Sequence, residues 1–214
     1  MQIKPEELTA KGYVLLDKLE HKELVPFIRT YMNKRTRFSI IYYLSNAIVF
    51  AITGYFFAAG YNAPDYILGN RFTHFSYGLA LAFILLPLHE YIHMLAYKSQ
   101  GAANTSYAAN LKKMYFMALA DKFVANKKEF QVVALAPFIC ITTALTIAFF
   151  FVNQTWSLTL TATLLAHTAM CSGDFGLLSY FEYHKDKNVV TYDDIASNTS
   201  FFYGLAKQAQ KTTV

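Results

Sequence analysis

The stretch FSYGLALAFILLPLHEYIHMLAY, residues 75–97, decides the class of this protein. At a helical rise of about 1.5 Å per residue, a stretch of this length covers a bilayer core of about 30 Å. It nevertheless contains His89, Glu90 and His93 within five consecutive positions. Ionisable side chains are costly inside a bilayer, so these three require a partner, a metal ion or a water-filled cavity. The stretch therefore predicts a membrane helix that carries a chemical site.

Three further apolar runs have a similar length, at 38–59, 130–152 and 156–180, and the charged residues lie mostly between the runs. The chain is 55% apolar and only 15% charged, a composition that does not suit a soluble domain. We therefore predict an all-α membrane protein with four transmembrane helices. A membrane-associated β-hairpin or a loop is expected between the second and third spans.

The spans divide the chain into three parts. Residues 1–36 form an N-terminal segment, 37–182 a four-span membrane domain and 183–214 a C-terminal tail. In the N-terminal segment, apolar residues at helical spacing from Leu24 to Tyr31 lie opposite a basic face. This pattern predicts an amphipathic helix, which lies either on the membrane surface or against the protein's own cytoplasmic face.

Lysine and arginine are distributed unevenly around the spans. The first 37 residues carry eight, the 98–128 loop six and the tail four, whereas the other two loops carry only Arg71. By the positive-inside rule this places both termini and the 98–128 loop in the cytoplasm, with 60–74 and 153–155 outside. We thus expect a multi-pass protein of the cytoplasmic membrane. The net charge of +5 reflects this topology and predicts no nucleic-acid partner.

The run His89-Glu90-Tyr91-Ile92-His93 has the spacing of a zinc hydrolase motif. Residues i and i+4 share one face of a helix, so His89 and His93 can bind the same zinc ion. Glu90 then stands beside the metal, where it can accept a proton from the activated water and pass it to the leaving amine. Alternatively, both histidines merely hydrogen-bond neighbouring helices.

A zinc hydrolase needs a third protein ligand, and Asp174 is the best candidate. Besides Glu90, it is the only acidic residue within a predicted span. His89 follows the start of its span by 14 residues and Asp174 follows the start of its own by 18. These counts correspond to depths of roughly 21 and 27 Å in two spans that run in the same direction. The ligands therefore lie at similar heights, near the cytoplasmic side.

His167 and Cys171 are rivals for the third position, because they share a helical face with Asp174. His167 and Asp174 are two turns apart, about 10 Å, which argues against both binding one ion. We expect His167 to line the site, where it stabilises a substrate carbonyl or orients Glu90. An ordinary hydrogen bond between helices is the alternative role for His167.

Three motifs together resemble a known family. The segment LLPLHEYIHMLAYKSQGA, the later LAPF and CSGDFG resemble the zincin peptidase family of bacterial membrane proteins, a relative of the site-2 proteases that cut peptide bonds in or near the bilayer. The resemblance covers residues 75–182 and implies zinc bound by His89, His93 and Asp174, with Glu90 catalytic. Site-2 proteases usually present the aspartate as Asp-Gly, often after Asn-Pro, whereas Gly173 precedes Asp174 here and Phe175 follows it.

Two functional hypotheses follow. The first is an intramembrane zinc metallopeptidase that hydrolyses a membrane-anchored or membrane-adjacent protein, with the 98–128 loop holding an extended substrate by strand addition. The second is a non-catalytic membrane protein that binds metal as a sensor, transporter or assembly factor. Glu90 discriminates between them, because hydrolysis requires a proton acceptor beside the first histidine and metal binding alone does not.

Overall fold

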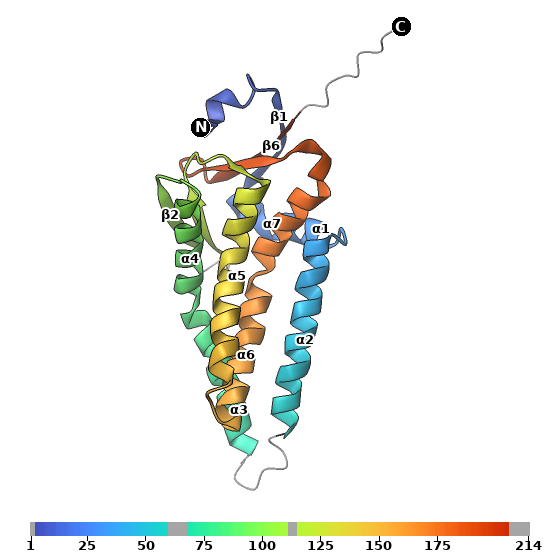
Figure 1. The fold of residues 1–214 in the computed structure, drawn as a ribbon, viewed down its shortest axis with the longest axis vertical. Helices are drawn as coiled ribbons and strands as arrows, with labels where there is room; N and C mark the ends of the chain where they lie inside the picture. Colours follow the sequence, from blue (N-terminus) through green and yellow to red (C-terminus); the bar gives the residue numbers. More distant parts are fainter. Residues whose placement is uncertain (1–2, 60–67, 111–114, 206–214) are drawn as a thin grey trace.

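The computed structural model describes residues 3–59, 68–110 and 115–205. Long helices form a bundle, and a small β-sheet covers one end of it (Figure 1). The helices are α1 (Leu24–Met32), α2 (Arg37–Ala59), α3 (Leu68–Ile84), α4 (Leu86–Ser99), α5 (Lys127–Phe149), α6 (Gln154–Met170) and α7 (Ser172–Tyr183). The strands are β1 (Tyr13–Glu20), β2 (Thr105–Asn110), β3 (Tyr115–Ala120), β4 (Ala125–Asn126), β5 (Val190–Asp194) and β6 (Thr199–Leu205). Short 3-10 turns lie at Pro5–Glu7, His21–Glu23 and Lys185–Lys187.

Within the described residues, three helical stretches are long and apolar enough to cross a membrane. They are α2, the stretch Asn70–Ser99 formed by α3 and α4, and α5. Large apolar side chains point outward from them: Phe50 on α2 is 67% exposed and Ile139 on α5 is 55% exposed. Because such a surface is poorly solvated by water and well solvated by lipid, these helices suit the interior of a membrane.

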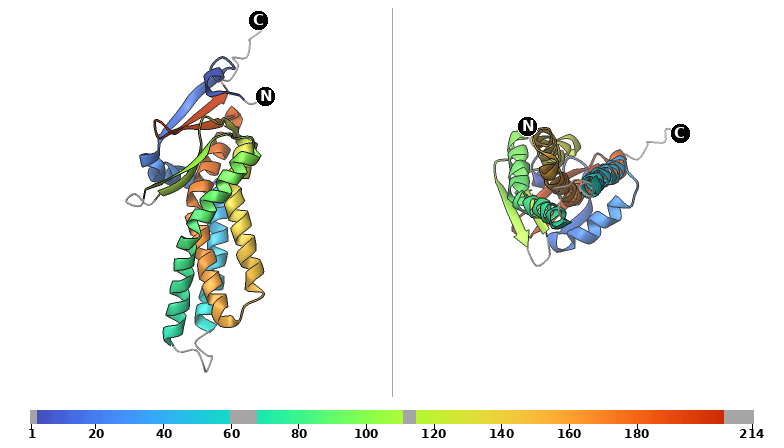
Figure 2. Two further views of the ribbon diagram at one scale, coloured as in Figure 1. Left: turned by 90° about the vertical axis from the view of Figure 1, so that its left-hand side faces the viewer. Right: turned by 90° about the horizontal axis from the view of Figure 1, so that it is seen from below.

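The prediction of four spans is wrong. The segment expected at 156–180 forms two helices, α6 and α7, which meet at Cys171, and neither belongs to the stretches that could cross a membrane. Threonines are frequent in α6, and Thr163 satisfies its hydroxyl by donating to the Thr159 carbonyl at 2.8 Å. Figure 2 shows α6 between α2, α3 and α5, which all contact it. Most of its surface is therefore covered by protein, so it does not need the apolarity of a lipid-facing helix.

The all-α prediction is also wrong, because a four-stranded antiparallel sheet in the order β1-β6-β5-β4 lies at one end of the bundle. The first strand pairs with the last described strand, with Tyr13 opposite Leu205. The predicted N-terminal segment and the predicted C-terminal tail are thus paired with each other in one sheet. Partners this far apart in sequence leave no local signal, and the burial along β1 does not alternate regularly.

Parts of two predicted loops fall outside the described residues. They are residues 60–67 of the outward-facing segment expected at 60–74, of which 68–74 belong to α3, and residues 111–114 of the loop expected at 98–128.

Between α4 and α5, strands β2 and β3 form a second, two-stranded antiparallel sheet, with Thr105 opposite Ala120. Both strands contact α4 (Figure 2). The segment at 98–128 is therefore strand over much of its described length, and its position beside α4 brings backbone close to the histidine motif.

The N-terminal helix α1 packs against the protein itself. Ile28 is buried and lies against Gly176 of α7, where a Cβ atom would come within 2.6 Å of the Ile28 side chain. Phe27 stacks on Phe202 of β6, with ring centroids 5.6 Å apart. This helix therefore connects the sheet to the end of the bundle that carries α7.

Close packing between α3 and α6 depends on Gly78. A Cβ atom added there would lie 2.5 Å from the Ala162 Cβ and from the Thr159 carbonyl oxygen. We expect Gly78→Ala to lower the free energy of unfolding by about 1–3 kcal/mol and the melting temperature by about 3–10 °C, because the backbones must move apart. The matched control is Gly54→Ala on α2, where no atom lies within 4 Å of the added Cβ. Thermal unfolding in detergent micelles measures both, and equal melting temperatures would refute the packing claim.

Candidate metal centre

Helix α4 carries the histidine motif into the interior of the protein. His89, Glu90 and His93 are 5%, 7% and 6% exposed. The one-turn spacing of the two histidines places their rings together, with centroids 4.8 Å apart. Burying ionisable side chains is unfavourable unless each one is paired with another charge, hydrogen-bonded or bound to a metal ion.

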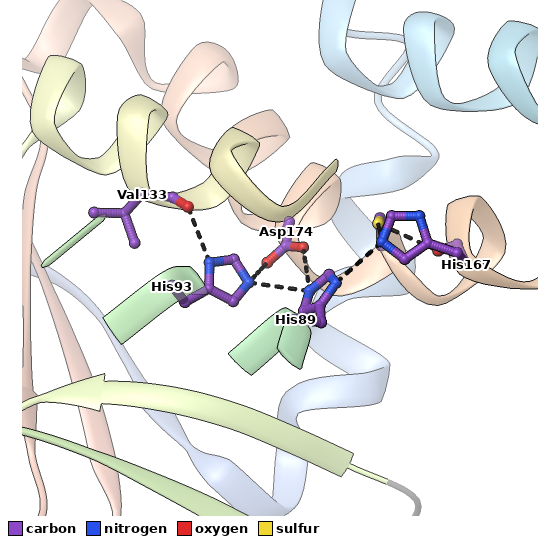
Figure 3. A network of polar contacts seen from close by, with 6 residues as sticks. His89, His93, Val133, His167 and Asp174 are labelled. Atoms are coloured by element: carbon purple, nitrogen blue, oxygen red, sulfur yellow. Dashed lines mark hydrogen bonds and ion pairs between the residues drawn. The ribbon is translucent and has the colours of Figure 1, made fainter. Parts of the chain in front are cut away.

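Asp174 reaches the same point from α7. Its Oδ1 lies 3.2 Å from His93 Nε2 and its Oδ2 lies 3.4 Å from His89 Nε2. The two Nε2 atoms are themselves 3.1 Å apart. Figure 3 shows the carboxylate between the two rings. The three residues singled out as metal ligands from the sequence are thus brought together, with one ligand atom from each within 4.8 Å of the others.

The hydrogen bond of His93 shows which of its ring nitrogens carries a lone pair. Nδ1 lies 2.9 Å from the Val133 carbonyl, and because a carbonyl can only accept, Nδ1 carries the proton. In the neutral ring, Nε2 is then an unprotonated acceptor that faces a carboxylate and the Nε2 of His89. Electron-rich atoms at this separation repel one another, and either a metal cation between them or a proton on one ring would offset that repulsion.

Zinc fits this donor set. Two imidazoles and one carboxylate are a set that hydrolytic zinc sites use, with a fourth position left open. Ligand bonds of about 2.0–2.1 Å in a tetrahedral site place the ligand atoms about 3.3–3.4 Å apart. The separations of 3.1, 3.2 and 3.4 Å between the Nε2 and carboxylate atoms are close to this value.

His167 lies behind His89. Its Nε2 is 3.4 Å from His89 Nδ1, on the side of the ring away from Asp174 (Figure 3). A zinc-bound His89 carries its proton on Nδ1, and His167 Nε2 is placed to accept it. His167 therefore holds the ring of a candidate metal ligand, and it is absent from the described residues that line the adjoining cavity.

Cys171 forms a second group with His89 and His167, whose ligand atoms also lie within 4.8 Å of one another. This group faces away from the cavity, however, and the Cys171 thiol donates to the His167 carbonyl at 3.3 Å. A metal held there would be out of reach of a substrate in the cavity. The group with Asp174 is the one that could serve catalysis.

A cavity of about 590 Å³ opens onto the Asp174 group. Glu90 lines it beside both histidines, and Glu90 Oε2 has no hydrogen-bond partner among the described residues. The backbone N–H of Ala118 on β3 faces the same carboxyl group. One oxygen of Glu90 is thus left free to exchange a proton.

Several residues around the centre could not be identified from the sequence. Val133 contributes only a backbone carbonyl and Ala118 only a backbone N–H, so neither leaves a trace in residue type. Tyr97 follows His93 by one turn on the ligand face of α4 and lines the cavity. Its position four residues after His93 was the only feature of the sequence that indicated a place beside the ligands.

Comparison with known families identifies the group to which the chain belongs. The family described as "Putative zincin peptidase" matches residues 82–188, half of the chain. The chain belongs to this family. No curated protein and no solved structure matched. The zincin peptidase region contains α4, the β2–β3 pair, α5, α6 and α7, and thus all of the candidate ligands. The family's description implies zinc and peptide-bond hydrolysis, which agrees with the donor set of the centre.

We predict that the contact between His89 and His167 strengthens zinc binding. His167→Leu removes the acceptor for His89 Nδ1–H, so we expect zinc affinity to fall about 10- to 100-fold while saturating zinc still binds one per chain. His167→Gln keeps an acceptor oxygen near the former Nε2 position and should retain most of the affinity. Competition titration with a chelating dye measures both. Equal affinity in the leucine variant and the wild type would remove His167 from the centre.

Proposed function

We propose that this chain is an intramembrane zinc metallopeptidase, which hydrolyses a peptide bond of a membrane-anchored or membrane-adjacent protein. The observation that carries the proposal is the position of Glu90. It lies in the cavity directly beside the atoms of His89, His93 and Asp174 that converge. The second hypothesis, metal binding without turnover, gives no reason for a buried glutamate with a free oxygen at this point.

The chemistry needs one contribution from the metal and several from the chain. A zinc ion at the centre would supply a Lewis acid that polarises the scissile carbonyl and lowers the pKa of water. Glu90 takes the proton of the attacking water and delivers it to the leaving amine. The Ala118 N–H and the burial of α4 hold the Glu90 carboxyl group in place for both transfers.

Strand β3 offers a guide for the substrate. One edge of β3 pairs with β2, and Phe116, Met117 and Ala118 line the cavity. An extended peptide that paired with the cavity-facing part of β3 would pass Glu90, because the Ala118 N–H points at that side chain. An extended substrate also exposes its backbone carbonyl, which a helical membrane segment does not.

The surroundings of the cavity support a substrate that comes from the membrane. Phe83 and Leu86 line it on the stretch α3–α4, which is long and apolar enough to span a bilayer. Residues of β5 and β6 line it at the opposite end, in the sheet outside the bundle. In this proposal that sheet lies in the cytoplasm, and water reaches the centre from its side.

Glu90→Gln tests the proposal. The amide cannot accept the proton, so we expect cleavage of membrane-tethered peptides in proteoliposomes to fall at least about 100-fold. The bound zinc should remain at one per chain, because Glu90 is not a ligand. A mixed peptide library read by mass spectrometry measures cleavage whatever sequence the enzyme prefers.

Glu23→Gln is the matched control, since Glu23 is exposed in the 3-10 turn before α1. It should cleave at the wild-type rate. Cleavage by Glu90→Gln at the wild-type rate would contradict the role of Glu90. A zinc-loaded wild type that cleaves no member of the library would instead favour metal binding without turnover.

A further inference from the structure

The cavity beside the metal centre continues to the terminal sheet and ends there on a carboxyl group. Asp193 and Thr191 of β5 and Ser200 of β6 line this end. Ser200 and Thr191 are buried, and Asp193 is half-buried. A polar end to an otherwise largely apolar cavity marks the place where a ligand's polar group is recognised.

Asp193 is held by neutral donors. The Ser200 hydroxyl donates to Asp193 Oδ1 at 2.6 Å, and the backbone N–H of Ala120 supplies a further hydrogen bond. Within the described ranges, no lysine, arginine or histidine nitrogen lies within 4.0 Å of this carboxylate. Asp121 is nearby and adds negative charge. The carboxylate is thus fixed in position without a counter-ion.

His21 does not neutralise this charge. Its Nε2 lies 3.3 Å from the Ser200 oxygen, and because that hydroxyl donates its proton to Asp193, the imidazole N–H donates to Ser200. Burial lowers the pKa of His21, which favours the neutral ring. Burial also raises the pKa of Asp193 to about 6, which still leaves the carboxylate mostly ionised at pH 7. A half-buried carboxylate without a counter-ion therefore faces the cavity.

The charge lies within reach of a substrate bound at the metal centre. Tyr97 stands one helical turn, about 6 Å, beyond His93 on α4, and both Asp174 and Asp193 act electrostatically on its hydroxyl. An extended chain advances about 3.3 Å per residue. Asp193 is thus a few residues from the peptide bond that would lie at Glu90.

We propose that Asp193, positioned by Ser200, is a subsite for a lysine or arginine side chain of the substrate, a few residues from the bond that is cut. This inference rests on the proposed function and specifies its substrate class. The two ends of the cavity favour such a substrate: the bundle end is apolar at Phe83 and Leu86, whereas the sheet end is acidic. Membrane proteins carry lysine and arginine just outside their spans on the cytoplasmic side. The segment recognised is therefore a juxtamembrane one, apolar on one side of the scissile bond and cationic on the other.

The test is a matched series of membrane-tethered peptides that differ only at this position, with lysine, arginine, glutamine or glutamate. We expect the wild type to cleave the cationic peptides roughly 10- to 100-fold more efficiently than the glutamine peptide, the range for a hydrogen bond between charged groups. Asp193→Asn should lose this preference, so that it cleaves the cationic peptides no more efficiently than the glutamine peptide. Asp193→Lys should prefer the glutamate peptide.

Two outcomes would overturn the subsite. One is a wild type with no preference among the four peptides, a result that needs no variant to fold. The other is an Asp193→Asn protein in which cleavage of all four peptides falls by the same factor, as a purely structural role would cause. Asp186→Asn, the same change at an exposed carboxylate in the turn Lys185–Lys187 and outside the cavity lining, is the control and should keep the preference.

A binding measurement tests the subsite independently of the proposed peptidase activity. Fluorescence anisotropy with the same peptides and Glu90→Gln protein requires no turnover. Tighter binding of the cationic peptides that disappears in Glu90→Gln/Asp193→Asn supports the subsite, even if the wild type cleaves nothing. Equal affinity for all four peptides in Glu90→Gln overturns the subsite, even if the wild type proves to be a peptidase.

Discussion

The repulsion among three electron-rich atoms is the constraint on which the rest of this structure depends. The Nε2 atoms of His89 and His93 and the carboxylate of Asp174 lie 3.1 to 3.4 Å apart in the interior of the protein. A cation between them, either a metal ion or a proton on one ring, would offset their mutual repulsion. Two further contacts keep them together, because the Val133 carbonyl and His167 each hold one ring from behind. These contacts orient the lone pairs before any ligand arrives.

The break between α6 and α7 is what allows these groups to come together. A straight helix through Cys171 would carry His167 and Asp174 about 10 Å apart along one axis. Because the helix ends at Met170 and restarts at Ser172, His167 lies behind His89 while Asp174 lies in front of it. His167 and Asp174 thereby contact the imidazole of His89 from opposite sides.

The closeness of the candidate ligands could be predicted from the sequence better than the architecture could. His89, Glu90, His93 and Asp174 could be found because ionisable residues stand out in apolar runs and because helical rise converts residue counts into depth. The same reasoning assigned a fourth span to 156–180, where buried threonines show instead that protein surrounds α6. The β1–β6 pairing joins residues near opposite ends of the chain, so no local pattern could reveal it. Asp193 and Ser200 reach the cavity only through that sheet, which is why they were missed.

Zinc K-edge X-ray absorption of the full chain, loaded with zinc in detergent or nanodiscs, tests the metal centre most directly. We predict a first shell of nitrogen and oxygen only, at about 2.0–2.1 Å, with the outer-shell scattering of two imidazoles. A sulfur ligand at about 2.3 Å would place the ion at Cys171 instead, away from Glu90. That result, or a failure of the chain to bind zinc at all, would contradict a hydrolytic centre built from His89, His93 and Asp174.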